Sequence, residues 1–225
     1  MAGLLIIIFY GLMILRIYAF LTGRRKEAVH HGGIVWASAL FMMIGIRIRR
    51  EGLDNITGYK NYVFASNHAS VLDILALAAS IPIKFVFVMD DQLFKIPFFG
   101  SYNRFAGNLP VSRIDPKQAR QDMQNIVSCL SQGESIVIFG EGGRSRDGKL
   151  HNFKSGVGVL AGESGVPVIP VAISGSYNLM RRRSIIIDPG EILVNFGAPI
   201  KFGPDEPPIR IAAAVHDKVE EMLKS

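Results

Sequence analysis

Residues 62–80 read YVFASNHASVLDILALAAS, an apolar run followed by a polar loop and a second apolar run. The first four residues of this stretch, 62–65, are mostly β-branched or aromatic and predict a short buried strand. Residues 70–80 predict a helix, with Ser70 as its N-cap and Asp73 in its first turn. This stretch therefore predicts a strand, a loop and a helix in immediate succession.

The same alternation of strand and helix continues outward to the C-terminus. Helices are expected at 70–80, 116–132, 155–163 and 208–223, and Asp115, Pro116 and Gly133 mark the ends of the second. Alternating elements of this kind predict an α/β fold, with a mixed, largely parallel sheet covered by helices. The expected strands are 46–49, 62–65, 84–88, 109–111, 135–139, 168–173, 185–187 and 192–196.

Charge and apolar content divide the 225 residues into two parts. Residues 1–50 hold seven cationic side chains and one acidic one, whereas 51–225 hold 18 of each, so the net charge of +6 lies wholly in the N-terminal fifth. A membrane-associated helical pair is therefore predicted for 1–46, and an α/β domain for 47–225. The single cysteine, Cys129, excludes an intramolecular disulfide framework and favours a reducing compartment.

The N-terminal part contains two apolar runs, 4–21 and 34–46, separated by a polar turn at 23–33. A full membrane span needs about 20 apolar residues. We therefore expect two antiparallel helices that enter the cytoplasmic leaflet of the cell membrane without crossing it; the alternative is one span followed by a buried helix. Basic residues beside apolar helices favour an anionic membrane surface by about 1 kcal/mol each. The sequence contains no basic face with interleaved aromatic residues, so nucleic acid is not an expected partner.

The loop at 67–73 carries a histidine and a carboxylate in a spacing that suits catalysis. His68 lies between the expected strand and helix, and Asp73 follows five residues later. A carboxylate bound to Nδ1–H fixes the imidazole tautomer and leaves Nε2 free as a base. This is the orienting logic of a Ser-His-Asp triad without the protein serine, so the nucleophile would be a hydroxyl on the substrate. The alternative is a polar loop with capping residues.

Two further polar segments follow expected strands or lie beside them. Residues 140–145, GEGGRS, follow the strand at 135–139, and open α/β sheets bind ligands at the carboxyl ends of their strands. Residues 107–113, GNLPVSR, end in Arg113, which suits a phosphate group. Residues 166–171, VPVIPV, predict core structure or a wall for an apolar ligand.

In this order and spacing, the segments resemble the motifs of the glycerolipid acyltransferase family, which includes the 1-acyl-glycerol-3-phosphate acyltransferases. The resemblance covers residues 48–200 and implies that His68 is the general base, with Asp73 as its orienter. It also implies an acceptor site in which Arg113 and Arg144 bind the phosphate group of the acceptor. The residues expected at that site are Asn67, Arg113, Glu141, Gly142, Arg144, Ser145 and Lys154. Gly140, Gly143 and Ser112 stand where the family usually has Pro, Thr and often Asp.

The resemblance implies transfer of a fatty acyl group from acyl-CoA or acyl carrier protein to a lysophospholipid hydroxyl. The expected acceptor is 1-acyl-sn-glycerol-3-phosphate, which would give phosphatidate. No cofactor is expected. No metal is expected either, since His30 and His31 have no third ligand nearby. Three alternatives stay open: an acyltransferase for another lysolipid, a lipid hydrolase using the same histidine, and a silent membrane scaffold of the same fold.

Overall fold

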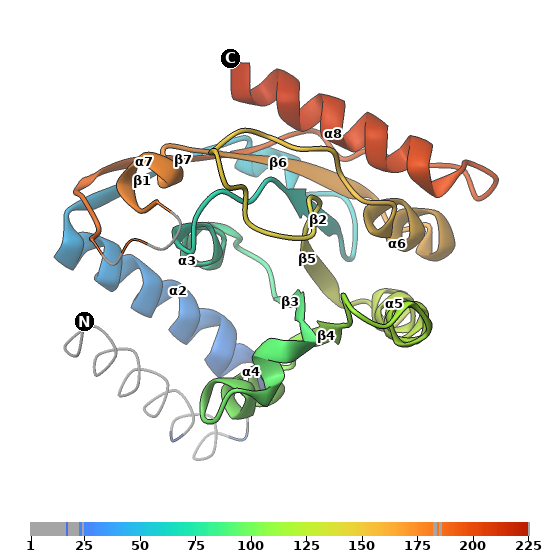
Figure 1. Cartoon of the computed structure of the whole chain (residues 1–225), viewed down its shortest axis with the longest axis horizontal. Helices are drawn as coiled ribbons and strands as arrows, with labels where there is room; N and C mark the ends of the chain where they lie inside the picture. Colours follow the sequence, from blue (N-terminus) through green and yellow to red (C-terminus); the bar gives the residue numbers. More distant parts are fainter. Residues whose placement is uncertain (1–16, 18–22, 24, 182–183, 185, 225) are drawn as a thin grey trace.

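The computed structural model describes residues 17, 23, 25–181, 184 and 186–224. Within these ranges, seven strands form one sheet in the order β1-β7-β6-β2-β5-β3-β4 (Figure 1). All neighbouring strands are parallel except β6 and β7. The expected mixed, largely parallel sheet is therefore confirmed. The strands are β1 Ile46–Glu51, β2 Val63–Ser66, β3 Phe85–Asp90, β4 Leu109–Val111, β5 Ser135–Phe139, β6 Val168–Ser174 and β7 Gly190–Phe196.

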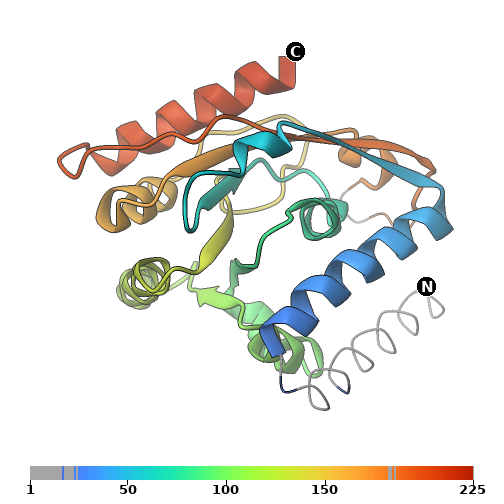
Figure 2. The same ribbon diagram turned by 180° about the vertical axis from the view of Figure 1, so that it is seen from behind.

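Helices cover both faces of the sheet. One face carries α5 Pro116–Ser131, α6 Gly156–Ser164 and α8 Pro208–Lys224, and the other carries α2 Arg25–Ile44 and α3 Leu72–Ser80 (Figures 1 and 2). Asp115 caps α5 as predicted, because its carboxylate accepts hydrogen bonds from the backbone N–H groups of Lys117 and Gln118. The remaining elements are η1 Leu53–Asn55, η2 Asp91–Lys95, α4 Phe99–Ala106 and α7 Ser176–Leu179.

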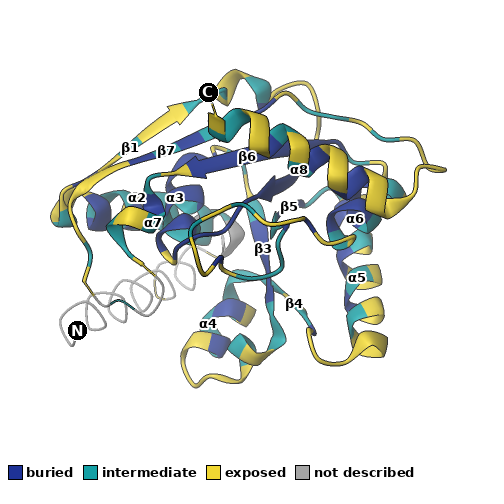
Figure 3. Cartoon of the chain, turned by 45° about the horizontal axis from the view of Figure 1, so that its top comes forward, coloured by how far each residue is buried: buried dark blue, intermediate teal, exposed yellow. Residues whose placement is uncertain are grey.

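The core consists of two apolar layers, one on each face of the sheet. Along β2, Phe64 packs into the layer beneath α2 and α3, while Val63 and Ala65 pack into the layer beneath α5, α6 and α8. All three side chains are fully buried. Strands covered on both faces read as continuous apolar runs rather than alternating ones. Figure 3 shows this as dark central strands beneath helices whose outer surfaces are exposed.

The polar turn predicted at 23–33 is wrong. Helix α2 begins at Arg25 and includes Gly32 and Gly33, which the sequence interpretation placed outside any helix. A glycine inside a helix costs about 1 kcal/mol relative to alanine, and packing of the helix offsets such a cost. Apart from Ile17, the first apolar run at 4–21 lies outside the described residues. Among those that are described, no helix combines the length and apolar character needed for a membrane crossing.

The strand predicted at 185–187 is also wrong for the two residues of it that are described, Ile186 and Ile187. The Ser184 hydroxyl accepts a hydrogen bond from the backbone N–H of Ile186 and donates one to the carbonyl of the same residue. Such local side-chain bonds give the backbone an alternative to pairing in a sheet. The isoleucine run therefore belongs to the connection before β7.

Candidate active site

The loops after β2 and β5 lie side by side, because these strands are parallel neighbours in the sheet. Two backbone hydrogen bonds join the loops. The N–H of Gly140 donates to the carbonyl of Ser66 at 2.9 Å, and the N–H of Ser145 donates to the carbonyl of His68 at 2.7 Å. The structure thus brings the first two sequence motifs together at the carboxyl edge of the sheet, where open α/β folds bind their ligands.

His68 and Asp73 form the predicted pair. His68 Nδ1 lies 2.9 Å from Asp73 Oδ2, and the same carboxylate oxygen accepts hydrogen bonds from the backbone N–H groups of Ala69 at 2.7 Å and Ser70 at 2.8 Å. Asp73 is fully buried. Three donors converging on one buried oxygen fix the orientation of the carboxylate, and the carboxylate in turn fixes the imidazole. The predicted contact is therefore confirmed, whereas the catalytic roles stay predictions.

The His68 ring lies flat against the ring of Phe139, the last residue of β5. The ring centroids are 3.8 Å apart and the planes differ by 14°. Phe139 is itself parallel to Phe87 of β3, at 6.4 Å between centroids. None of the described residues forms a hydrogen bond with His68 Nε2. The imidazole is thus held on one side by a carboxylate and on one face by an aromatic platform, with Nε2 available to a ligand.

Glu141 supports the loop that carries His68. Its Oε1 accepts the backbone N–H of His68 at 2.8 Å, and its Oε2 accepts that of His151 at 3.3 Å. Burial raises the pKa of the Glu141 carboxyl above its usual value, although both backbone donors act in the opposite direction. These contacts give Glu141 a positioning function. Its predicted part in shaping the acceptor site stays a prediction.

Asn67 also makes contacts within the fold. Its carboxamide donates to the carbonyl of Ile173 at 2.9 Å and accepts the backbone N–H of the same residue at 2.8 Å. This pair of bonds ties the loop before His68 to β6, much as a neighbouring strand would. The geometry assigns Asn67 to holding the loop in place, and contact with a substrate stays a prediction.

Cationic side chains gather around the turn at Gly142 and Gly143. The Arg113 guanidinium lies beside Gly143, since a Cβ built there would be 3.5 Å from Arg113 Nη1, and Arg113 Nε is 3.3 Å from Asp90 Oδ2. The Lys154 side chain lies over Gly142, whose φ of 71° favours glycine. The structure therefore places two predicted cations, from distant parts of the sequence, on one short turn.

Arg144 and Ser145 follow the same turn. Arg144 is exposed, whereas Ser145 is buried and its hydroxyl donates to Asp147 Oδ1 at 2.9 Å. The hydrogen bonds from this hydroxyl and from the backbone N–H of Lys149 lower the pKa of Asp147 to about 2. Ser145 therefore closes the loop on itself. The described contacts assign it to loop structure, and substrate contact by either residue stays a prediction.

An apolar cavity of about 270 Å³ opens next to this site. It is enclosed by α2, α3, β3 and α4, and its wall includes Phe87, the residue that stacks on Phe139. The sequence did not reveal this cavity, because its walls come from four separate elements. Its lining residues are Val29, His30, Gly33, Trp36, Ala37, Val71, Ile74, Leu75, Ala78, Phe85, Phe87, Met89, Phe99, Tyr102, Asn103, Ala106 and Asn108.

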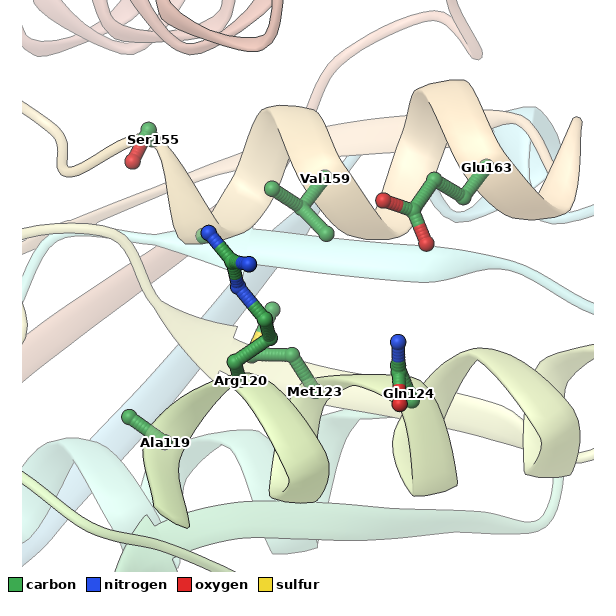
Figure 4. Close-up of a pocket in the computed structure, with 8 residues that line it drawn as sticks. Ala119, Arg120, Met123, Gln124, Ser155, Val159 and Glu163 are labelled. Carbon is green, nitrogen blue, oxygen red and sulfur yellow. The ribbon is translucent and has the colours of Figure 1, made fainter. Parts of the chain in front are cut away.

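A second hollow of about 490 Å³ lies on the other face of the sheet, between α5 and α6. In Figure 4, Arg120 of α5 reaches toward the start of α6 near Ser155, and Gln124 lies opposite Glu163. This groove shares no lining residue with the apolar cavity, and none of its lining residues was predicted as a site residue. No predicted site residue lines the apolar cavity either, but that cavity is linked to the His68 ring, because Phe87 in its wall is parallel to Phe139, on which the ring stacks.

Comparisons with known proteins agree with this arrangement. The model of the Acyltransferase family matches residues 47–174. A chloroplast 1-acyl-sn-glycerol-3-phosphate acyltransferase from Arabidopsis thaliana is 33% identical over 78% of this chain and 49% of its own. An enzyme of the same name from Haemophilus influenzae is 27% identical over 92% and 86%. The chain thus spans about half the length of the chloroplast relatives it matches.

The solved structures include a similar fold. The crystal structure of a 1-acyl-sn-glycerophosphate acyltransferase from Thermotoga maritima has a TM-score of 0.80 and 26% sequence identity, and the match covers 98% of this chain and 91% of that one. The family match begins one residue after the start of β1 and ends at the last residue of β6, so it includes both paired motifs of the site. The chain belongs to the acyltransferase family.

Proposed function

We propose that this protein transfers a fatty acyl group from an acyl thioester to the free hydroxyl of 1-acyl-sn-glycerol-3-phosphate, giving phosphatidate. The observation that carries the proposal is the buried His68–Asp73 pair. The His68 ring stacks on Phe139, which is parallel to Phe87 in the wall of the apolar cavity, and the His68 loop is joined to the segment that carries the turn flanked by cations. The names of the relatives supply the acceptor. Acyl-CoA and acyl carrier protein both fit as thioester donors.

In the proposed reaction, His68 Nε2 removes the proton of the acceptor hydroxyl as its oxygen attacks the thioester carbonyl. A tetrahedral intermediate forms and collapses, the carbon–sulfur bond breaks, and the imidazolium returns its proton to the leaving thiolate. General-base assistance of this kind contributes about 10²–10⁴-fold. Asp73 stabilises the imidazolium that forms between the two proton transfers. The reaction needs neither a covalent acyl-enzyme nor a metal.

The proposed tetrahedral intermediate also needs hydrogen-bond donors that stabilise its oxyanion. Backbone N–H groups near Asn67 or at the start of the helix that follows would be suitable donors. The N–H groups of Ala69 and Ser70 already donate to Asp73, and that of His68 donates to Glu141. These three groups therefore hold the catalytic loop in place, and another donor must serve the tetrahedral intermediate.

Arg144→Ala is expected to raise the KM for a lysophosphatidate acceptor by about 10–100-fold with little change in kcat. One charge-assisted hydrogen bond contributes about 1.5–3 kcal/mol, and this energy is lost equally from substrate and transition state. Initial rates across a range of acceptor concentrations measure the effect. Arg146→Ala is the matched control, since Arg146 is an exposed arginine of the same loop. An unchanged KM in Arg144→Ala would remove the phosphate-binding role.

Gly33→Phe is expected to shift acyl-chain preference toward shorter donors. We propose that the apolar cavity holds the acyl chain. Gly33 lines this cavity, and a Cβ built there meets nothing within 4 Å, so a larger side chain enters the space that the chain would occupy. Each excluded methylene lowers kcat/KM by about fourfold, since one buried CH₂ contributes about 0.8 kcal/mol. A series of acyl-CoA lengths tests this.

The control for the cavity variant is Val35→Phe, in which the same side chain is added two residues along α2. Val35 is 68% exposed and does not line the cavity. It should leave the chain-length profile unchanged. If Gly33→Phe and Val35→Phe gave the same profile as the wild type, the cavity would not hold the acyl chain.

We further propose that the protein acts at the cytoplasmic face of the cell membrane, with residues 1–46 as a monotopic helical pair. The net charge of +6 in the N-terminal fifth supports this placement, because anionic lipids concentrate in that leaflet. A site at the interface spares the long chains of acceptor and product a full transfer into water. Labelling residues 3 and 27 from one side of sealed vesicles tests the placement, and opposite accessibility would contradict a monotopic pair.

One assay separates the proposed function from its alternatives. Free thiol release from acyl-CoA is followed with a thiol reagent, and the lipid products from a panel of lysolipids are identified by mass spectrometry. Phosphatidate formation from lysophosphatidate supports the proposal. Preference for another lysolipid would replace the acceptor, fatty acid release without lysolipid would indicate a hydrolase, and no thiol release would indicate a scaffold.

A further inference from the structure

The turn between η2 and α4 has an unusual backbone. Phe98 has a φ of 61° and a ψ of −52°, and it is the single non-glycine residue of the described ranges with positive φ. The N–H of Phe99 donates to the carbonyl of Pro97 at 2.7 Å. A hydrogen bond from residue i+2 to residue i around such angles defines the γ-turn with positive φ, which is rare and strained.

The surrounding contacts hold this strained turn in place. The N–H of Gly100 donates to the carbonyl of Ile96 at 2.8 Å, and the Arg104 guanidinium donates to the carbonyl of Phe94 at 2.8 Å. Gly100 lies so close to Phe94 that an added Cβ would be 2.0 Å from its carbonyl oxygen. Strain of this kind persists only where neighbouring structure fixes it, and such positions cluster at functional sites.

The strained turn displays apolar side chains to solvent. Phe98 is 76% exposed, Ile96 is 48% exposed and Phe99 is 38% exposed. Most other large aromatic side chains of the sheet region, such as Phe64 and Phe196, are buried. The turn thus leaves most of the Phe98 side chain accessible to solvent. We call residues 96–99 the apex turn.

The apex turn lies beside the apolar cavity. Phe99, which belongs to the turn, also lines that cavity, together with Tyr102 of α4 and Val29 of α2. Figures 1 and 2 both show α4 next to the first turns of α2, at the end of the molecule opposite α8. An exposed apolar projection and the space proposed for an acyl chain therefore share one side of the molecule.

We propose that the apex turn inserts into the interfacial layer of a phospholipid bilayer and holds the mouth of the apolar cavity against the lipid. The inference rests on the proposed function for its biological meaning. Aromatic rings favour the bilayer interface. Lys95 and Arg104 flank the turn with exposed cationic side chains, which suit anionic headgroups, and Lys95 also forms an ion pair with Asp91 at 3.3 Å.

A second protein molecule fits this feature less well than a bilayer does. Stable protein interfaces bury about 800 Å² on each partner and use about 20–30 residues. Ile96, Phe98 and Phe99 are three exposed side chains on one turn, far fewer residues than such an interface uses. Side chains of this number and kind match the shallow insertion of a peripheral membrane protein.

A fluorescent label tests the insertion directly. In a Cys129→Ala background, Phe98→Cys is labelled with an environment-sensitive fluorophore and mixed with vesicles of equal parts phosphatidylcholine and phosphatidylglycerol. The expected result is a blue-shifted emission and quenching by spin-labelled lipids. Ile209→Cys, in the first turn of α8 and 62% exposed, is the matched control and should show neither. Water-like emission at position 98 on vesicles, or a label shift that follows dimerisation without vesicles, would overturn the proposal.

Phe98→Gly separates insertion from a merely structural role. Glycine adopts positive φ at little cost, so Tm should rise, whereas loss of the ring should weaken vesicle binding by about 10-fold or more. Transfer to a short-chain, water-soluble lysophosphatidate should stay at the wild-type rate, while transfer on vesicles falls. Unchanged vesicle binding would overturn the proposal. A wild type inactive in both assays would refute the proposed function, while the label result still decides the insertion.

Discussion

Replacing His68 by alanine is expected to lower kcat for acyl transfer by at least about 10²–10⁴-fold, because the acceptor hydroxyl loses its general base. The fold should survive. The backbone N–H of His68 still donates to Glu141, and its carbonyl still accepts from Ser145. Loss of the ring contact with Phe139 should cost about 0.5–1.5 kcal/mol beyond the buried area. Steady-state transfer rates and thermal unfolding of the same preparation measure both quantities.

The matched control for this variant is His31→Ala, which removes an exposed imidazole from α2. It should keep both wild-type turnover and wild-type Tm. Near-normal turnover in His68→Ala would refute the mechanism, because acyl transfer would then proceed without His68 as the general base. Loss of turnover with a strongly lowered Tm would instead show that the ring is needed for folding. The variant Asp73→Asn, which keeps the ring, distinguishes that case.

The parts of the fold that depend on local sequence patterns could be predicted. The strand at β5 and the Asp115 cap of α5 are local signals, and both are confirmed. The predicted turn at 23–33 was wrong because two glycines suggested a break that packing of α2 overrides. Helix α4 went unpredicted because Pro97 and Gly100 look like loop residues. The order of the strands could not be predicted from the sequence either, because it depends on pairing between distant segments, such as β1 and β7.

The site shows the same division between local and distant contacts. His68 and Asp73 are five residues apart, so their contact could be predicted from one motif. Asn67 meets Ile173 across 106 residues, and no local pattern shows that its carboxamide is engaged with β6. Glu141 holds the backbone of His68, a contact that depends on β2 and β5 being neighbours. The contact between His68 and Asp73 could thus be predicted from the sequence, whereas the contacts that hold the pair in place depend on the folded chain.

Asp73→Asn is expected to lower kcat by about 10²–10⁴-fold while leaving the geometry of the site almost unchanged. All three hydrogen bonds converge on Oδ2, so an amide oxygen can occupy that position and accept from His68, Ala69 and Ser70 as before. The imidazole tautomer is then preserved, and at the Oδ2 position the change removes only the negative charge. A unit charge about 4 Å away at an effective dielectric constant of about 20 contributes about 4 kcal/mol to imidazolium stability, which corresponds to about 10³-fold, the middle of the range.

The amide NH₂ of this variant would occupy the position of Oδ1, a buried atom for which the described residues provide no hydrogen-bond partner. A buried donor left without a partner costs about 1–3 kcal/mol, so unfolding by denaturant should show a loss of that size. Asp122→Asn is the matched control. Asp122 of α5 is another buried carboxylate, and it accepts a hydrogen bond from the backbone N–H of Ser112. It should lose stability without a comparable loss of kcat. If Asp73→Asn retained wild-type kcat, the carboxylate charge would have no part in the reaction, and Asp73 would serve only to orient the ring.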